Sequence, residues 1–287
     1  MEFDKIMKKR RLVCIFIVLS IVLVLSLSAC SGLLGKSNTQ RYYIDIGQVE
    51  DASVASIVYN NSISSCVRVI TEYSANSRVA GSGFIITSDG YVLTNRHCVV
   101  RYPSGSDLPE YKSDKPLSAT YYVVFADSTK QHPATLVNWC TTADIAVLKI
   151  NDAKDGTYEH PMEFETEQEI YPGQKVYTIG NPDDIGLMLS ELMVASPSMR
   201  FAKKDENDKL IEDQFDSVVL DGNINHGNSG GPLINVYGRV SGIVYARIDG
   251  SKNDMYGLGC AIPTNEIIKY LSSIKNVKIN YKTNSEA

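Results

Sequence analysis

Apolar residues recur along most of this chain in short runs that are separated by turn residues. From about residue 66 to residue 262, runs rich in Val, Ile and Tyr alternate with Gly, Pro, Asn and Asp. Such short, bounded runs are typical of β-strands. The pattern predicts strands at residues 66–73, 83–86, 91–94, 119–125, 145–150, 175–179, 217–220, 239–245 and 257–262. This many short strands favours a β-sandwich or a β-barrel.

Helical spacing is confined to two places. Residues 263–274 carry apolar side chains at helical intervals and predict a helix near the C-terminus, and residues 51–62 predict a short one. Two polar segments, residues 101–117 and 203–216, predict surface loops.

The N-terminus has the pattern of an export signal. Lys and Arg residues between positions 5 and 11 precede an apolar run at 12–27, which ends in Ser28, Ala29 and Cys30. The last four residues resemble a bacterial lipoprotein signal, in which the cysteine is lipidated and anchors the protein to the membrane. An uncleaved membrane anchor is an alternative, since about 18 to 20 apolar residues span a bilayer, and plain secretion is another. All three place the rest of the chain outside the cytoplasm.

Length and composition indicate one exported globular domain. The 287 residues are 44% hydrophobic and 21% charged, which argues against disorder. We expect a signal peptide at 1–29, a polar tether at 30–50, a folded domain at 51–275 and a loose tail at 276–287. The net charge is -5 and no basic block lies beyond the N-terminus, so a nucleic-acid partner is not expected.

The cysteines leave their redox state open. Cys14 lies in the signal and Cys30 is the lipidation candidate, so four cysteines remain in the predicted domain. They allow either two disulfides or four buried free thiols. Their spacing matches no metal site, and we expect neither a metal ion nor another cofactor. The four are Cys66, Cys98, Cys140 and Cys260.

Candidate chemistry begins at Ser229, in the sequence Gly-Asn-Ser-Gly-Gly-Pro at 227–232. A serine hydroxyl is a poor nucleophile that needs a neighbouring base and N–H donors for the developing oxyanion. Glycines around a serine let the backbone turn tightly and present such N–H groups. An ordinary glycine-rich turn is the alternative.

His97 and Asp144 supply the base and its partner. His97 follows a predicted strand, and Asp144 precedes another. A histidine held at a strand end suits a general base, and a buried carboxylate there needs a hydrogen-bond partner. The order His, Asp, Ser along the chain is that of chymotrypsin-type triads.

Several blocks in this order resemble the trypsin-like peptidases, most closely the HtrA type. The similarity covers about residues 62–274. The matching blocks are Gly-Ser-Gly-Phe-Ile-Ile at 81–86, Tyr-Val-Leu-Thr-Asn-x-His at 91–97, Asp-Ile-Ala-Val-Leu-Lys at 144–149, Ile-Gly-Asn-Pro at 179–182, Gly-Asn-Ser-Gly-Gly-Pro-Leu at 227–233 and Ala-Ile-Pro at 261–263.

The resemblance implies an all-β fold of two six-stranded antiparallel barrels with a C-terminal helix. It also implies protein or peptide substrates, an oxyanion hole at Gly227 and Ser229, and a possible homo-oligomer. Asn228 resembles the HtrA type and removes the carboxylate that trypsin-type zymogens use, so we expect activity without proteolytic activation. HtrA peptidases usually carry a PDZ domain after the peptidase domain, and we expect none here.

The specificity pocket is predicted from position relative to the nucleophile. Asn223 and Ile224 should lie at its base, while Tyr245, Ala246 and Arg247 should line a wall. Without an acidic residue at the base, a small or medium apolar substrate side chain is expected.

Two other functions compete with an endopeptidase. A catalytically silent binding or scaffold module would keep the fold and triad residues with a blocked cleft. Hydrolysis of non-peptide esters or cell-wall material is the third reading.

Overall fold

The computed structural model describes residues 51–74, 77–106, 115–166, 169–204, 210–212, 215–248, 257–275 and 277–279. All of them belong to one compact unit that spans residues 42–287. The predicted signal peptide and the tether with Cys30 lie outside the described residues. Within the described ranges, no helix combines the length and apolar character needed to cross a membrane.

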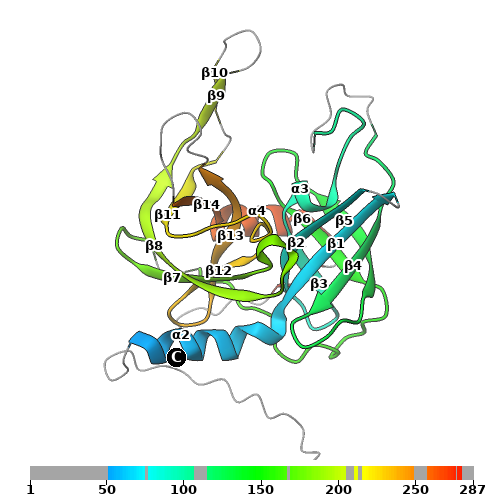
Figure 1. The fold of residues 1–287 in the computed structure, drawn as a ribbon, viewed down its shortest axis with the longest axis horizontal. Coiled ribbons are helices and arrows are strands. Elements are labelled where there is room, and N and C mark those ends of the chain that lie inside the picture. Colours follow the sequence, from blue (N-terminus) through cyan, green and yellow to red (C-terminus); the bar gives the residue numbers. More distant parts are fainter. Residues whose placement is uncertain are drawn as a thin grey trace, which may run out of the picture. The chain divides into compact units, whose positions relative to one another are not determined.

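Six antiparallel strands close the first barrel in the order β1-β2-β3-β6-β5-β4 (Figure 1). Alternate side chains of these strands point inward and form an apolar cluster, because successive residues of a strand face opposite sides. Val67, Val69, Val92 and Leu148 are fully buried in it. The strands are β1 (Cys66–Ser74), β2 (Ser77–Ile85), β3 (Tyr91–Thr94), β4 (Thr120–Phe125), β5 (His132–Trp139) and β6 (Ala146–Ile150).

A second closed barrel follows, with the order β11-β14-β13-β12-β7-β8. Its own cluster contains Val194, Leu220, Leu233 and Val244, all buried. The strands are β7 (Lys175–Gly180), β8 (Met188–Met199), β11 (Ser217–Asp221), β12 (Pro232–Asn235), β13 (Val240–Ile248) and β14 (Leu258–Pro263).

A third cluster joins the two barrels and the helices. Phe84 of the first barrel and Tyr177 of the second are fully buried in it. Val58 of α2 (Asp51–Ser62) and Ile267 of α4 (Thr264–Leu271) also belong to it, so both predicted helices pack against this shared core. The short helix α3 (Arg96–Val99) follows β3, and 3-10 turns occupy Ile63–Ser65 and Pro182–Asp184.

The predicted fold class is confirmed, but several strands had not been predicted. β5, β8 and β12 were missed, and part of the segment predicted as a loop at 203–216 forms a hairpin of β9 (Ala202–Lys204) and β10 (Leu210–Glu212). The two strands pair antiparallel, with Ala202 opposite Glu212, and the charged sequence had predicted a loop because it shows no apolar alternation. None of the four described cysteines forms a disulfide. Cys66, Cys98 and Cys260 are buried but Cys140 is half-buried, so the alternative of four buried thiols holds for three of them.

Candidate active site

His97 and Asp144 come from the ends of neighbouring strands. β3 pairs with β6 so that Thr94 lies opposite Ala146. His97 lies in α3, immediately after β3, and Asp144 lies just before β6. The strand pairing therefore brings together two residues that are 47 positions apart.

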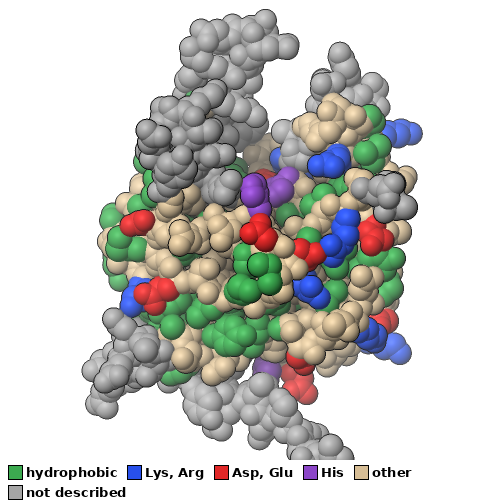
Figure 2. Space-filling view, viewed as in Figure 1, with side chains coloured by type: hydrophobic (Ala, Val, Ile, Leu, Met, Phe, Trp, Pro, Cys, Tyr) green, Lys and Arg blue, Asp and Glu red, His purple; other side chains and the backbone are tan. Residues whose placement is uncertain are grey.

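The Asp144 carboxylate holds His97 at two points. Its Oδ2 lies 2.5 Å from His97 Nδ1, and its Oδ1 accepts the His97 backbone N–H at 3.0 Å. Asn95 Nδ2 donates to the Asp144 carbonyl at 2.7 Å. The Asp144 side chain is 14% exposed and that of His97 is 36% exposed, so the imidazole reaches the surface on one side. Figure 2 shows histidine side chains next to acidic ones near the middle of the face that it draws.

The pair shifts the pKa of both members. Burial lowers the pKa of His97, but the adjacent Cys98 sulfur and the Asp144 carboxylate raise it by more than burial lowers it. The pKa of His97 therefore lies well above its ordinary value of 6.5. Burial raises the pKa of Asp144, and the hydrogen bond from His97 together with the charges of His97 and Arg96 outweighs that effect and holds it below the ordinary value. The carboxylate is thus ionised and suited to orient the ring.

Ser229 lies in the turn between β11 and β12, and that turn docks on the first barrel. The Ser229 carbonyl accepts the Ser82 backbone N–H at 2.8 Å. Cys98, the residue after His97, places its Sγ 3.7 Å from the same carbonyl oxygen. The serine segment is therefore fixed beside the histidine segment. The Ser229 hydroxyl itself donates to the Tyr245 carbonyl at 3.4 Å.

Two glycines make this turn possible. Gly227 has φ +93, and a Cβ there would lie 2.0 Å from the Asn181 carbonyl oxygen. Gly230 has φ +87, and its Cβ would lie 2.1 Å from the Ser82 carbonyl oxygen. Across the described residues, the N–H groups of Gly227 and Ser229 donate no hydrogen bond.

The residues predicted to line the specificity pocket differ in their burial and contacts. Asn223 is exposed, whereas Ile224 is only 7% exposed and packs into the second-barrel cluster. The Tyr245 hydroxyl pairs with Ser217 Oγ at 2.9 Å. Ala246 and Arg247 lie on β13 opposite β14, and their side chains are outside the described part of the structure.

Sequence reasoning had missed a network beneath the serine turn. Ser82 Oγ donates to the Gly227 carbonyl at 2.6 Å and accepts the Asn181 N–H at 2.8 Å. The Asn181 side chain in turn donates to Asp184 at 3.0 Å, and Arg78 of the first barrel lies 2.6 Å from the other Asp184 oxygen. The only sequence signal for this network was that Ser82 and Asn181 fall within blocks matching the family.

Asp184 adopts an uncommon backbone conformation. Asp183 and Asp184 have φ 48 and 58, in the left-handed region. The Asp183 N–H donates to the His226 carbonyl at 2.8 Å, next to Gly227. Burial raises the pKa of Asp184, but the Asn181 amide and the Arg78 guanidinium lower it by more than burial raises it. The pKa of Asp184 is therefore below its ordinary value.

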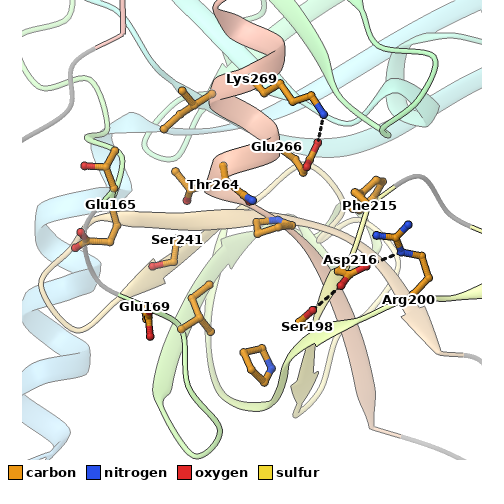
Figure 3. A pocket seen from close by; sticks show the side chains of 16 residues that line it. Glu165, Glu169, Ser198, Arg200, Phe215, Asp216, Ser241, Thr264, Glu266 and Lys269 are labelled. Carbon is orange, nitrogen blue, oxygen red and sulfur yellow. Dashed lines mark hydrogen bonds and ion pairs between the residues drawn. The ribbon is translucent and has the colours of Figure 1, made fainter.

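A cavity of about 930 Å³ lies elsewhere (Figure 3). It is bounded by β8, α4 and residues near Phe215, and neither the histidine pair nor Ser229 lines it. Ion pairs join Arg200 to Asp216 at 2.5 Å and Lys269 to Glu266 at 3.5 Å along its wall. The candidate active site is therefore defined by side-chain chemistry and not by cavity volume.

Two antiparallel barrels, with a His–Asp pair on one and a serine in a glycine-rich turn on the other, define the chymotrypsin-like class of fold and site. The family model described as the trypsin-like peptidase domain matches residues 81–243, more than half of the chain. The chain belongs to this family.

Relatives point to the HtrA type within it. The chain is 32% identical over 186 residues to a probable periplasmic serine endoprotease, DegP-like, of Rhizobium meliloti, covering 65% of this chain and 31% of the relative. It is 30% identical over 208 residues to the serine endoprotease DegS of Haemophilus influenzae, covering 72% of this chain and 53% of the relative. The chain thus spans 31% and 53% of these two relatives' lengths, less than two thirds in each case.

Solved structures show the same fold. A protease from M. tuberculosis in its active form superposes with a TM-score of 0.61 at 22% identity, covering 80% of this chain and 89% of that one. A serine endoprotease from Yersinia pestis gives a TM-score of 0.56 at 24% identity, covering 78% of this chain and 66% of that one. The inferred resemblance to HtrA-type, trypsin-like peptidases is confirmed.

Proposed function

We propose that this protein is a serine endopeptidase that cleaves extracytoplasmic proteins through His97, Asp144 and Ser229. The observation that carries the proposal is the Asp144–His97 hydrogen bond, set beside the docked turn that holds Ser229. The family membership and the endoprotease relatives support the same activity.

The reaction starts with a rotation of the Ser229 hydroxyl from the Tyr245 carbonyl toward His97. Catalytic hydrogen bonds are often long or misdirected before substrate binds, so this resting contact is compatible with catalysis. His97 Nε2 takes the hydroxyl proton as Oγ attacks the peptide carbonyl carbon, while Asp144 fixes the Nδ1–H tautomer. The Gly227 and Ser229 N–H groups stabilise the oxyanion, each contributing about 2.7 to 4 kcal/mol.

The tetrahedral intermediate then breaks down. His97 gives its proton to the leaving amine, and the C–N bond breaks to leave an acyl-enzyme on Ser229. Water enters, loses a proton to His97 and attacks the ester carbonyl. Collapse of the second intermediate releases the carboxylic acid and returns the proton to Ser229.

The substrate pocket is proposed to take a small or medium apolar side chain before the cleaved bond. Asn223 and Ile224 would form its base, and Tyr245, Ala246 and Arg247 one wall. Ile224 is apolar, which supports an apolar base, although only 7% of the residue is exposed. Asn228 in place of aspartate supports an enzyme that needs no proteolytic activation.

The site of action is proposed to be the outer side of a bacterial membrane, with the chain anchored through lipidated Cys30. The periplasmic names of the DegP-like relatives support an extracytoplasmic location. Mass spectrometry of the mature N-terminus tests the anchor: a diacylated or triacylated Cys30 is expected. An unprocessed Met1 terminus, or an unmodified soluble form, would contradict it.

Labelling with a fluorophosphonate tests the activity. The full chain in detergent should be labelled, and Ser229→Ala should not. Casein turnover by the wild type, lost in the same variant, would establish peptide hydrolysis. A folded wild type that is not labelled would contradict the proposal.

A silent binding module is the second candidate function. The observation that favours it is the Ser229 hydroxyl bound to the Tyr245 carbonyl and not to His97. Peptide binding that survives Ser229→Ala, without labelling of the wild type, would support this alternative.

A further inference from the structure

Arg96 is a buried arginine directly beside the histidine of the active site. It lies in α3 between Asn95 and His97 and is only 6% exposed. Burying a guanidinium costs several kcal/mol unless it is paired and hydrogen-bonded. A surface role as a solubilising charge is therefore ruled out, and its partners indicate what it does.

Two of its partners belong to the loop that carries Asp144. Arg96 Nη1 donates to the carbonyl of Cys140 at 2.7 Å and to that of Ala143 at 2.8 Å. The two carbonyls lie at the start of the loop and immediately before Asp144. A single guanidinium nitrogen thus ties both ends of the Cys140–Ala143 turn together.

Asn95 and His97, the two chain neighbours of Arg96, hold Asp144 itself. Asn95 Nδ2 donates to the Asp144 carbonyl at 2.7 Å, and His97 contacts the Asp144 carboxylate through its backbone N–H and its ring. Three consecutive residues of the β3–α3 junction therefore hold this segment: Asn95 holds the Asp144 carbonyl, Arg96 the preceding loop, and His97 the Asp144 carboxylate. The charge of Arg96 also favours the ionised Asp144.

We propose that Arg96 is a positioning residue, which holds the Cys140–Asp144 loop so that the Asp144 carboxylate stays on His97 Nδ1. This inference rests on the proposed function of the triad. Arg96 acts through the loop that carries Asp144. Its loss should therefore impair the chemical step more than substrate binding.

Lysine can replace only part of this role. Its ammonium keeps the charge, but its flexible stem does not hold the nitrogen in a fixed plane, as the guanidinium does where Nη1 reaches both carbonyls. Glutamine removes the charge and keeps a neutral donor. Comparing Arg96→Lys with Arg96→Gln therefore separates charge from geometry, and Arg200→Gln, which breaks the Arg200–Asp216 ion pair at the wall of the separate cavity, controls for the loss of an arginine.

The experiment measures kcat and KM for a fluorogenic peptide, the fluorophosphonate labelling rate, and the proton NMR resonance of His97 Nδ1–H in the full chain. For Arg96→Gln we expect kcat and the labelling rate to fall about 10-fold to 100-fold, as small misplacements of catalytic groups do. KM should stay within about 2-fold, and the resonance should broaden or move upfield. Arg96→Lys should recover part of the loss, and Arg200→Gln should match the wild type.

Two results would overturn the inference. A folded Arg96→Gln protein with unchanged kcat, labelling and resonance would show that Asp144 needs no support from Arg96. Failure of both Arg96 variants to fold would make the residue purely structural. The NMR resonance needs no turnover, so it tests the positioning of Asp144 even if the wild type were found inactive, which would contradict only the proposed function.

Discussion

Ser82 Oγ of the first barrel donates to the carbonyl oxygen of Gly227 of the second at 2.6 Å. The same oxygen atom accepts the Asn181 N–H at 2.8 Å. Ser82 is fully buried, so water cannot replace either bond. One hydroxyl thus holds the Gly227 carbonyl and the Asn181 N–H of the second barrel on the first barrel.

Removing that hydroxyl should loosen the turn. Ser82→Ala leaves the Gly227 carbonyl and the Asn181 N–H with weaker partners, and we expect a loss of about 1 to 3 kcal/mol in the free energy of unfolding. A misplaced oxyanion donor should also lower kcat about 10-fold or more. Urea denaturation and peptide kinetics measure both. Ser88→Ala is the control, because the Ser88 bond to Asp155 is exposed; equal effects of the two variants would contradict this reading.

Gly227 and Gly238 form a matched pair for testing the tightness of the turn. Both have positive φ, at +93 and +79, but a Cβ at Gly238 meets nothing within 4 Å, whereas one at Gly227 meets the Asn181 carbonyl. Gly238→Ala should cost about 1 to 2 kcal/mol from left-handed strain alone, with normal kcat. Gly227→Ala should cost more and abolish fluorophosphonate labelling. Labelling at the wild-type rate in Gly227→Ala would show that the turn adjusts without losing the site.

The strand pattern was readable where strands are buried on one or both faces. β3 has the predicted bounds, Tyr91–Thr94, and its last three residues are buried. β5 was missed because Ala134 is the only residue of the strand that is buried, so its sequence shows little apolar contrast. β12 was missed because its four buried residues follow the Gly-Gly pair directly and had been interpreted as part of the serine motif.

The sequence was enough to predict which residues carry the chemistry of the site, but not which residues hold them in place. His97 and Asp144 stand out as a base and a carboxylate at strand ends, and the structure brings them together. Ser82 and Arg96 carry no such signal, because their roles depend on backbone carbonyls that come close only in the folded chain. Sequence spacing cannot reveal a partner of that kind.

The raised pKa of His97 sets the pH dependence of activity. A general base must be neutral, so kcat/KM should fall as the pH drops through a His97 pKa well above 6.5. Asp144→Asn removes a cause of the raised pKa and should move this acid limb to lower pH. It should also lower kcat by a factor on the order of 10⁴, since the ring tautomer is no longer fixed. A pH profile of both proteins tests this, and an unmoved limb would contradict the assignment.

The same pair should stabilise the fold in a defined pH window. Because the folded-state pKa of His97 is raised, its contribution is complete below the unfolded pKa and is lost as pH rises through the folded value. Because that of Asp144 is lowered, its contribution is lost as pH falls through the folded value. Asp144→Asn should therefore lower Tm most between these limits. Equal Tm losses at alkaline and weakly acidic pH would exclude a role for the ion pair.

Ile224 should set the depth of the substrate pocket. Its side chain covers Gly259, where a Cβ would lie 2.2 Å from Ile224 Cδ1, so the two residues already fill the space between them. Ile224→Val and Ile224→Ala should open room for larger apolar side chains before the cleaved bond. One methylene in such a pocket changes discrimination by about 1 to 3 kcal/mol, so the kcat/KM ratio of Leu to Ala substrates should rise about 10-fold or more in Ile224→Ala.

The control for this prediction is Ile234→Val, which removes a methyl group from a side chain buried in the core between the barrels. Both valine variants should lose about 0.5 to 1.5 kcal/mol of stability, because each leaves a small cavity. Only the Ile224 variants should change the substrate ratio. A ratio that shifts equally in Ile234→Val would mean that general loosening of the barrels, and not Ile224, governs selectivity, and the pocket would then have to be sought along β13.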